Sequence, residues 1–131
     1  MSFLVDTNVI GELARRRPNR GVLRFASQVH TIRLSVISLE EIHYGLAWKP
    51  NERIRAWFLR FLEEQCQVLP VSEEVARRSG ELRGRLQARG ATRTQADMLI
   101  AATAASHALT LVTRNTDDFE GCGVTVLNPF S

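Results

Sequence analysis

Apolar residues follow two patterns that alternate along the whole chain. Short runs rich in valine, leucine and isoleucine predict strands at 3–5, 32–37, 68–69, 111–112 and 125–127. Between them, apolar residues recur every three or four positions and predict helices over about 9–14, 22–29, 38–45, 51–65, 72–90 and 95–108. This alternation indicates an α/β fold built on a central, mostly parallel five-stranded sheet.

Two of the predicted helices differ in how much of their surface is apolar. The helix over 51–65 has a single apolar stripe, formed by Ile54, Trp57, Phe58, Phe61 and Leu62. The helix over 95–108 is small and apolar nearly all round, which predicts burial against the sheet. Because this helix and the one over 72–90 both lie between the third and fourth strands, the earlier one cannot pack by the simplest crossover.

Length and composition are those of one globular domain covering residues 1–131. Hydrophobic residues make up 44% of the chain, which is enough for a core. No basic segment followed by an apolar run and a small-residue cleavage site opens the sequence, so we expect no secretory signal. The longest helix-like apolar stretch, 98–109, is too short and too polar to span a bilayer. We therefore expect a soluble, intracellular protein without membrane contact.

The cysteines and the net charge restrict which kinds of site and partner we expect. Cys66 and Cys122 lack metal-ligand spacing and have no histidine close by, so we expect inert free thiols rather than zinc ligands or a disulfide. The net charge of +3 is weak evidence for a nucleic-acid partner. Of the 17 basic residues only Lys49 is lysine, and arginine suits bidentate contact with phosphate. The codon bias of a GC-rich genome would give the same excess.

Four acidic residues stand beside the predicted ends of strands. Asp6 follows the first strand directly, and Glu41 lies in the first turn of the helix after the second. Asp97 lies in the first turn of the helix that leads into the fourth strand, and Asp118 follows that strand in a turn. Sites in open parallel sheets form beyond the carboxyl ends of strands. We therefore expect these four carboxylates to converge on one rim.

Such a cluster points to metal-dependent chemistry. At ~4 Å and an effective dielectric constant near ~20, each pair of like charges costs about 4 kcal/mol. A divalent cation relieves this repulsion, and carboxylate oxygens select Mg²⁺ or Mn²⁺ rather than zinc. Mg²⁺ held by a few carboxylates keeps waters that serve as nucleophile, and the ion stabilises the attacking and leaving oxygens of a phosphodiester. The cluster thus predicts hydrolysis of RNA or DNA.

Each acid also has an ordinary structural interpretation. Asp6 could cap the first helix, and Asp118 could be a turn residue. The stretches 38–41 and 94–97 both fit a capping box, with the acid three residues after a hydroxyl. Asp97 is the hardest to explain in this way, because it shares a helix face with apolar residues, where an unpaired charge is costly.

Four segments resemble, in order, the motifs of PIN-domain nucleases. They are 3–10 (FLVDTNVI), 35–45 (SVISLEEIHYG), 96–104 (ADMLIAATA) and 113–119 (TRNTDDF). The spacing to the glycine of the second motif favours Glu41 over Glu40, and the acid next to Phe119 in the fourth favours Asp118 over Asp117. The ordered set covers essentially the whole chain, whose length and composition are similar to those of the VapC toxins of bacterial toxin–antitoxin modules.

The resemblance implies a three-layer α/β/α fold and a Mg²⁺-dependent endoribonuclease that acts as a toxin in the bacterial cytoplasm. It implies a homodimer and a cognate antitoxin that covers the active site. The protein would contact DNA only through that antitoxin. Carried over by position, the metal-binding catalytic acids are Asp6, Glu41, Asp97 and Asp118. The residues that would orient these ligands or touch the scissile phosphate are Thr7, Thr113 and Asn115.

An acidic site needs nearby cations to admit a polyanion. Arg114 adjoins the fourth motif and is the first candidate for contact with the RNA backbone. The further candidates are Arg15, Arg16, Arg17, Arg89 and Arg93. An ordinary solvated surface explains each of these arginines equally well.

Two other functions stay open from the sequence. In one, the acids are caps and turns, and the protein is a non-catalytic binding module in a DNA-bound autoregulatory complex with an antitoxin. In the other, it is a PIN nuclease with a non-toxin role in RNA or DNA processing. The presence of all four acids argues against the first, and the small size of the chain argues against the second.

Overall fold

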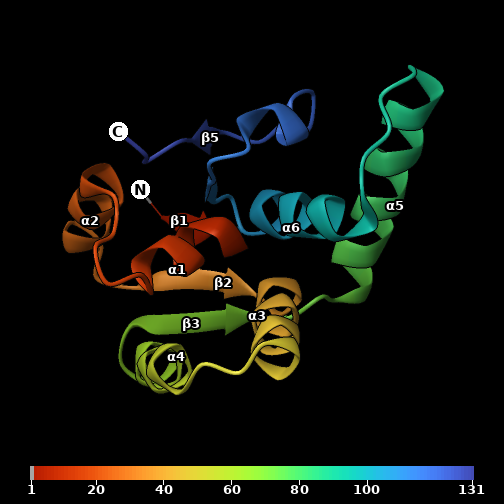
Figure 1. Ribbon diagram of the computed structural model, residues 1–131. Coiled ribbons are helices and arrows are strands. Elements are labelled where there is room, and N and C mark those ends of the chain that lie inside the picture. The colour runs from red at the N-terminus through yellow and green to blue at the C-terminus, as the bar shows by residue number, and fades with distance from the viewer. Residues whose placement is uncertain (1) are drawn as a thin grey trace.

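The computed structural model describes residues 2–131, in which a single twisted sheet is flanked by helices (Figure 1). The strands are β1 (Phe3–Val5), β2 (Ile32–Ser35), β3 (Cys66–Leu69), β4 (Thr110–Val112) and β5 (Val126–Leu127). They lie in the order β3-β2-β1-β4-β5, and every pairing is parallel. The order reverses at β1, so the carboxyl ends of β1 and β4 form the switch point where such sheets place their ligands.

Most helices begin at a polar cap that the local sequence predicts. The helices are α1 (Thr7–Leu13), α2 (Arg20–Ser27), α3 (Val36–Trp48), α4 (Glu52–Gln65), α5 (Glu73–Ala88), α6 (Gln95–Ser106) and the short 3-10 helix η1 (Thr116–Phe119). Ser72 Oγ accepts a hydrogen bond from Val75 N at 3.1 Å, and Asn51 Oδ1 accepts one from Ile54 N at 3.0 Å. These bonds satisfy N–H groups that a helix leaves unpaired at its start.

The boundary between the second strand and its helix differs from the prediction. β2 ends at Ser35, whose Oγ accepts from Ile37 N at 3.0 Å, so α3 begins at Val36 instead of Ser38. The predicted capping box over 38–41 is therefore wrong, and Glu41 lies in the second turn of α3. The β-branched residues after Ser35 have strand propensity, but the serine cap starts the helix there.

The end of α6 also differs from the prediction of 108. Ala108 adopts a left-handed conformation with φ of +52°, and Leu109 N donates to Ala104 O at 2.8 Å. This is a Schellman ending, which usually carries glycine at the position that Ala108 occupies. The sequence gives no glycine signal there, so the helix is predicted too long.

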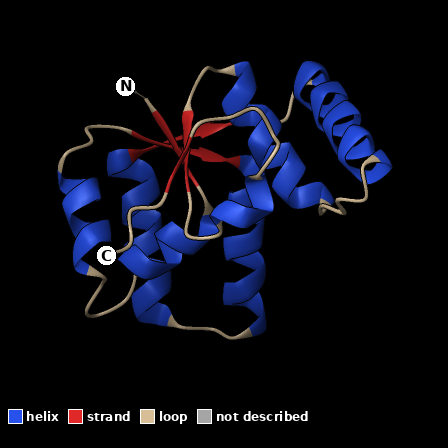
Figure 2. Cartoon of the chain, turned by 90° about the horizontal axis from the view of Figure 1, so that it is seen from above, coloured by secondary structure: helices blue, strands red, loops and turns tan. Residues whose placement is uncertain are grey.

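The sheet buries a different set of side chains on each face. Leu4 and Leu111 pack with residues of α6 on one side, and Val5 and Val112 pack with α1, α2 and α4 on the other. Figure 2 shows helices around both sides of the strands. The result is the three-layer α/β/α arrangement. Because successive side chains of a strand point to opposite faces, neighbouring residues of β1 and of β4 belong to different cores.

The two helices between β3 and β4 solve the crossover problem by stacking. α6 is buried against the sheet as its composition predicts, and α5 packs on α6 at the outside of the molecule (Figure 1). Both cysteines are free thiols; Cys122 is buried and Cys66 is half-buried. Within residues 2–131, no helix combines the length and the hydropathy that a membrane crossing requires.

Candidate active site

Asp6 lies at the switch point, directly after β1, and is only 5% exposed. Its Oδ1 accepts a hydrogen bond from Thr7 N at 2.8 Å, which caps α1. Its Oδ2 accepts from Thr113 Oγ1 at 2.8 Å and from Asn8 Nδ2 at 3.1 Å. Capping therefore accounts for one oxygen of Asp6, while the other is fixed by Asn8 in the same segment and by Thr113 from a distant one.

Asn8 and Thr113 join the start of α1 to the end of β4. Asn8 Nδ2 also donates to Thr113 Oγ1 at 3.2 Å, and Asn8 Oδ1 accepts from Arg114 N at 3.1 Å. The fully buried Thr113 in turn accepts from Asn115 N at 3.1 Å. Of the predicted supporting residues, Thr113 contacts Asp6 directly, whereas Arg114 and Asn115 enter this network through their backbone N–H groups.

Asn8 is the member of this network that the sequence analysis does not single out. Its signal is its place two residues after Asp6, in the first turn of α1, where a side-chain amide reaches both the preceding acid and a neighbouring strand. The side chain of Arg114 points elsewhere: its guanidinium carbon lies 4.7 Å from the centre of the Phe130 ring, in a cation–π contact.

Glu41 reaches the same network from α3. Its Oε1 accepts a hydrogen bond from Thr7 Oγ1 at 2.7 Å. Thr7 thus binds Asp6 through its backbone and Glu41 through its side chain. Although Glu41 lies one turn further along its helix than predicted, α3 starts at the carboxyl end of β2 and keeps it at this edge. It is Glu41, rather than Glu40, that makes the contact to Thr7.

Asp97 and Asp118 approach from the other side of the switch point. Asp97 is half-buried in the first turn of α6, where Thr94 Oγ1 accepts from its backbone N at 3.1 Å. The hydroxyl half of the predicted capping box is therefore confirmed. Asp118 is exposed in η1, directly before the buried Phe119. The charge of Asp118 acts on Asp97, as does the charge of Asp6.

Two of the four carboxylates, those of Asp6 and Asp97, have a raised pKa. Burial raises the pKa of Asp6 above its usual value, and the charge of Glu41 raises it further, against the hydrogen bonds from Thr113 and Thr7. Burial likewise raises the pKa of Asp97, and the charges of Asp6 and Asp118 add to this effect, against a hydrogen bond with Thr94 and the charge of Arg93. These interactions link all four predicted acids into one group.

The group is loose rather than a preformed metal cage. Within residues 2–131, no three His, Cys, Asp or Glu side chains lie close enough together to hold a metal ion. Carboxylates that repel one another are expected to stand apart. The donors are all oxygens, which fits a hard cation such as Mg²⁺, and Mg²⁺ needs only one or two direct carboxylates because it keeps several waters. The chemistry of the donors therefore fits a divalent ion that keeps its waters.

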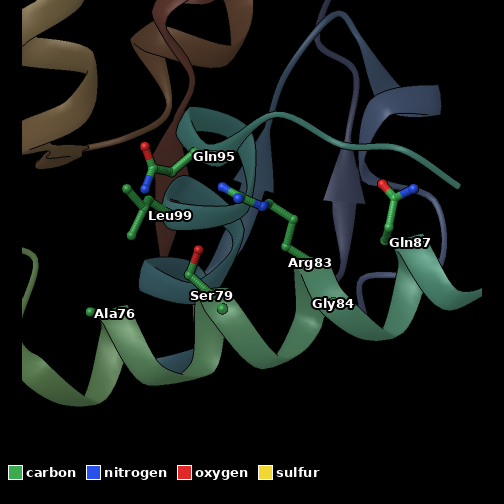
Figure 3. Close-up of a pocket in the computed structure, with 8 residues that line it drawn as sticks. Ala76, Ser79, Arg83, Gly84, Gln87, Gln95 and Leu99 are labelled. Carbon is green, nitrogen blue, oxygen red and sulfur yellow. The ribbon is translucent and has the colours of Figure 1, made fainter.

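A separate groove runs between α5 and α6 and has a volume of about 430 Å³ (Figure 3). Its walls are formed by Ala76, Ser79, Gly80, Arg83, Gly84, Gln87, Gln95 and Leu99. Figure 3 shows Arg83 reaching from α5 toward α6 across this groove. None of the four acids lines it, so it offers no carboxylate for the chemistry described above.

Comparison with known proteins places this geometry in a family. The model of the PIN domain family matches residues 3–121. The chain is 35% identical to VapC ribonuclease Y4jK of Sinorhizobium fredii, over 98% of this chain and 97% of the relative.

Two solved structures share the fold closely. In the crystal structure of FitAcB from Neisseria gonorrhoeae, a chain 33% identical to this one superposes with a TM-score of 0.83, covering 97% of both chains. In the structure of VapBC2 from Rickettsia felis bound to a DNA fragment from their promoter, a chain 26% identical to this one superposes with a TM-score of 0.87, covering 100% of both chains. The family match, the relative at 35% identity and the shared fold lead to one conclusion: this chain belongs to the PIN domain family.

Proposed function

We propose that this protein is a Mg²⁺-dependent endoribonuclease and the toxin of a toxin–antitoxin pair in the bacterial cytoplasm. The observation that carries the proposal is the convergence of Asp6, Glu41, Asp97 and Asp118, from four separate segments, at the switch point of the sheet. The fold gives no reason to gather these charges. Thr94 caps α6 through its own hydroxyl, and one oxygen of Asp6 is enough to cap α1.

Each supporting residue has a definable part in this site. Thr113 and Asn8 fix Oδ2 of Asp6, so this carboxylate would present a constant orientation to a bound ion. Thr7 holds Oε1 of Glu41 and leaves Oε2 to accept a proton from water. When bound, Mg²⁺ would supply a water of lowered pKa and would stabilise charge on the oxygens of the scissile phosphate.

The partners follow from the relatives. Solved structures similar to this chain include a toxin–antitoxin complex from Klebsiella pneumoniae and VapBC2 from Rickettsia felis bound to a DNA fragment from their promoter. We therefore assign this chain a cognate antitoxin that blocks the acidic site, and contact with DNA through that antitoxin. We also assign it a homodimer; Tyr44 and Trp48, one turn apart on α3 and 63% and 67% exposed, fit an interface between protein chains.

The test is cleavage of total bacterial RNA by purified protein free of antitoxin, in Mg²⁺, in Mn²⁺ and in EDTA. The variants Asp97→Asn and Asp118→Asn should lose cleavage. The matched control is Asp117→Asn, which removes the same charge one residue away from Asp118 and should cleave as the wild type does.

Discrete fragments that require the metal and vanish in the two variants would establish the proposed activity. If folded wild-type protein leaves all RNA intact in every metal, the nuclease proposal fails and the non-catalytic binding module takes its place. If Asp97→Asn cleaves at the wild-type rate, the acids are removed from the mechanism.

A further inference from the structure

Four arginines from two distant segments line one hollow of about 410 Å³ on the surface. Arg15, Arg16 and Arg17 follow α1 in the loop to α2, and Arg53 lies in the first turn of α4. None of the four acids of the candidate active site lines this hollow. These four residues form an arginine cluster.

The arginine cluster is held in place from both sides. Glu12, a buried acid of α1, accepts a hydrogen bond from Asn19 N at 2.8 Å and one from Arg15 Nη1 at 3.3 Å, so it ties down the loop at both its ends. Arg53 Nη1 donates to Ala14 O at 2.9 Å, which fixes the start of α4 to the end of α1. The loop that carries three adjacent positive charges is thus a built part of the fold.

The charges of this cluster are mostly uncompensated within the chain. Among residues 2–131, Arg15 is paired with Glu12, while Arg16, Arg17 and Arg53 form no ion pair. The contacts of Glu12 and Arg53 fix the two ends of the loop and the start of α4, so the segments that carry the four arginines stay around one hollow. Guanidinium groups match phosphate oxygens in fork geometry, and an array of phosphates offsets their mutual repulsion.

We propose that the arginine cluster binds backbone phosphates of an RNA strand whose scissile bond lies at the four acids. This inference rests on the proposed function. The acidic site and the arginine cluster lie at opposite ends of α1, since Asp6 precedes this helix and the cluster follows its last turn. At about 1.5 Å per residue the axial separation from Asp6 to Arg15 is about 13 Å, which an RNA strand of a few nucleotides can span. The cluster would thereby hold substrate that the acidic site itself repels.

The experiment measures binding of a short single-stranded RNA in EDTA, where metal-dependent cleavage cannot occur, as a function of salt. The variant Arg16→Gln/Arg17→Gln removes two exposed charges and leaves Arg15 and Arg53, with their structural contacts, in place. Arg83→Gln/Arg85→Gln on α5 removes the same charge from exposed positions elsewhere. Two lost phosphate contacts should lower affinity about tenfold at low salt and reduce the slope of log K against log salt by about 1.4, because each contact contributes ~0.7 for single strands. The α5 variant should keep the wild-type slope.

Cleavage in Mg²⁺ separates this inference from the proposed function. The loop variant, Arg16→Gln/Arg17→Gln, should have a higher KM for RNA and an unchanged kcat, because the arginine cluster binds substrate without touching the reacting atoms. If wild-type protein binds RNA through the cluster but never cleaves it, the proposed nuclease activity fails and the proposed RNA-binding site stands.

Several results would overturn the cluster as an RNA site. They are wild-type protein that does not bind RNA at low salt, a loop variant with an unchanged salt slope, and an equal loss in both variants. Polyglutamate serves as a further probe. If the loop variant loses polyglutamate binding and keeps RNA binding, the cluster receives an acidic protein segment instead.

Discussion

Replacing Thr113 by valine tests how the site fixes its central carboxylate. The change keeps the shape of the side chain in a fully buried position and removes only the hydroxyl. Asp6 Oδ2 then loses the shorter of its two hydrogen bonds, at 2.8 Å, and keeps the one from Asn8, while Asn115 N loses its acceptor at 3.1 Å. The matched control is Thr110→Val in β4, three residues before Thr113 and also buried, for which the described residues offer no side-chain hydrogen bond.

The expected loss follows from the charge of Asp6. A hydrogen bond to an ionised group contributes about 1.5–3 kcal/mol, and leaving the N–H of Asn115 unpaired adds about 1 kcal/mol. The bond from Thr113 lowers the pKa of Asp6 against the raising effect of burial, so it stabilises the ionised form. Its contribution is therefore present when Asp6 is ionised, and it is lost as the pH falls through the pKa of Asp6 in the folded protein.

The assay is the free energy of unfolding in denaturant, in EDTA, at neutral pH and at the lowest pH where the protein stays folded. Thr113→Val should lose about 2–4 kcal/mol at neutral pH and distinctly less in acid, whereas Thr110→Val should show one small, pH-independent change. Equal losses for Thr113→Val at both pH values would refute the reasoning, since they would show that the hydroxyl does not act on the charge of Asp6.

Three further predictions concern the acids and the start of α3. Asp97→Asn should be more stable than the wild type in EDTA at neutral pH, because a neutral amide avoids the burial and repulsion of charge that raise the pKa of Asp97. This gain in the free energy of unfolding should vanish as the pH falls through that pKa. Unfolding curves at neutral and at acidic pH measure both effects. Mg²⁺ at ~100 times its Kd should stabilise the wild type by about 2.7 kcal/mol, which EDTA reverses, and Asp97→Asn should show little of this shift in a thermal melt. Ser35→Ala should cost about 1 kcal/mol by removing the cap of α3. Ser38→Ala should cost nothing in the same denaturation assay, because Ser38 Oγ is buried without a partner among the described residues.

The local sequence predicts elements well where one strong signal acts alone. The apolar stripe that contains Phe58 and Phe61, for example, predicts α4 correctly. Prediction fails where two signals compete, as at Ser35, whose cap prevails over the strand propensity of the residues that follow. It also fails at Ala108, where the left-handed turn that ends α6 is taken up without a glycine.

For the candidate site, the sequence predicts where the acids lie better than it predicts how they are held. All four acids are placed at the correct edge from their position next to strand ends. The role of Asn8 is not predicted, because its contacts to Thr113 and Arg114 span more than a hundred residues of chain. The hydrogen bond from Thr7 to Glu41 is likewise invisible in either segment taken alone.

The sequence by itself therefore determined the fold class, the segments of the sheet and the edge at which the acids stand, because periodicity and caps act over a few neighbouring residues. Only the tertiary structure decided that β1 lies between β2 and β4, and hence that Asp6 meets Thr113 at the switch point. It also decided that Arg53 joins Arg15, Arg16 and Arg17 around one hollow. Strand order and helix packing bring distant segments together, and they arise from burying both faces of the sheet at once, which no local pattern specifies.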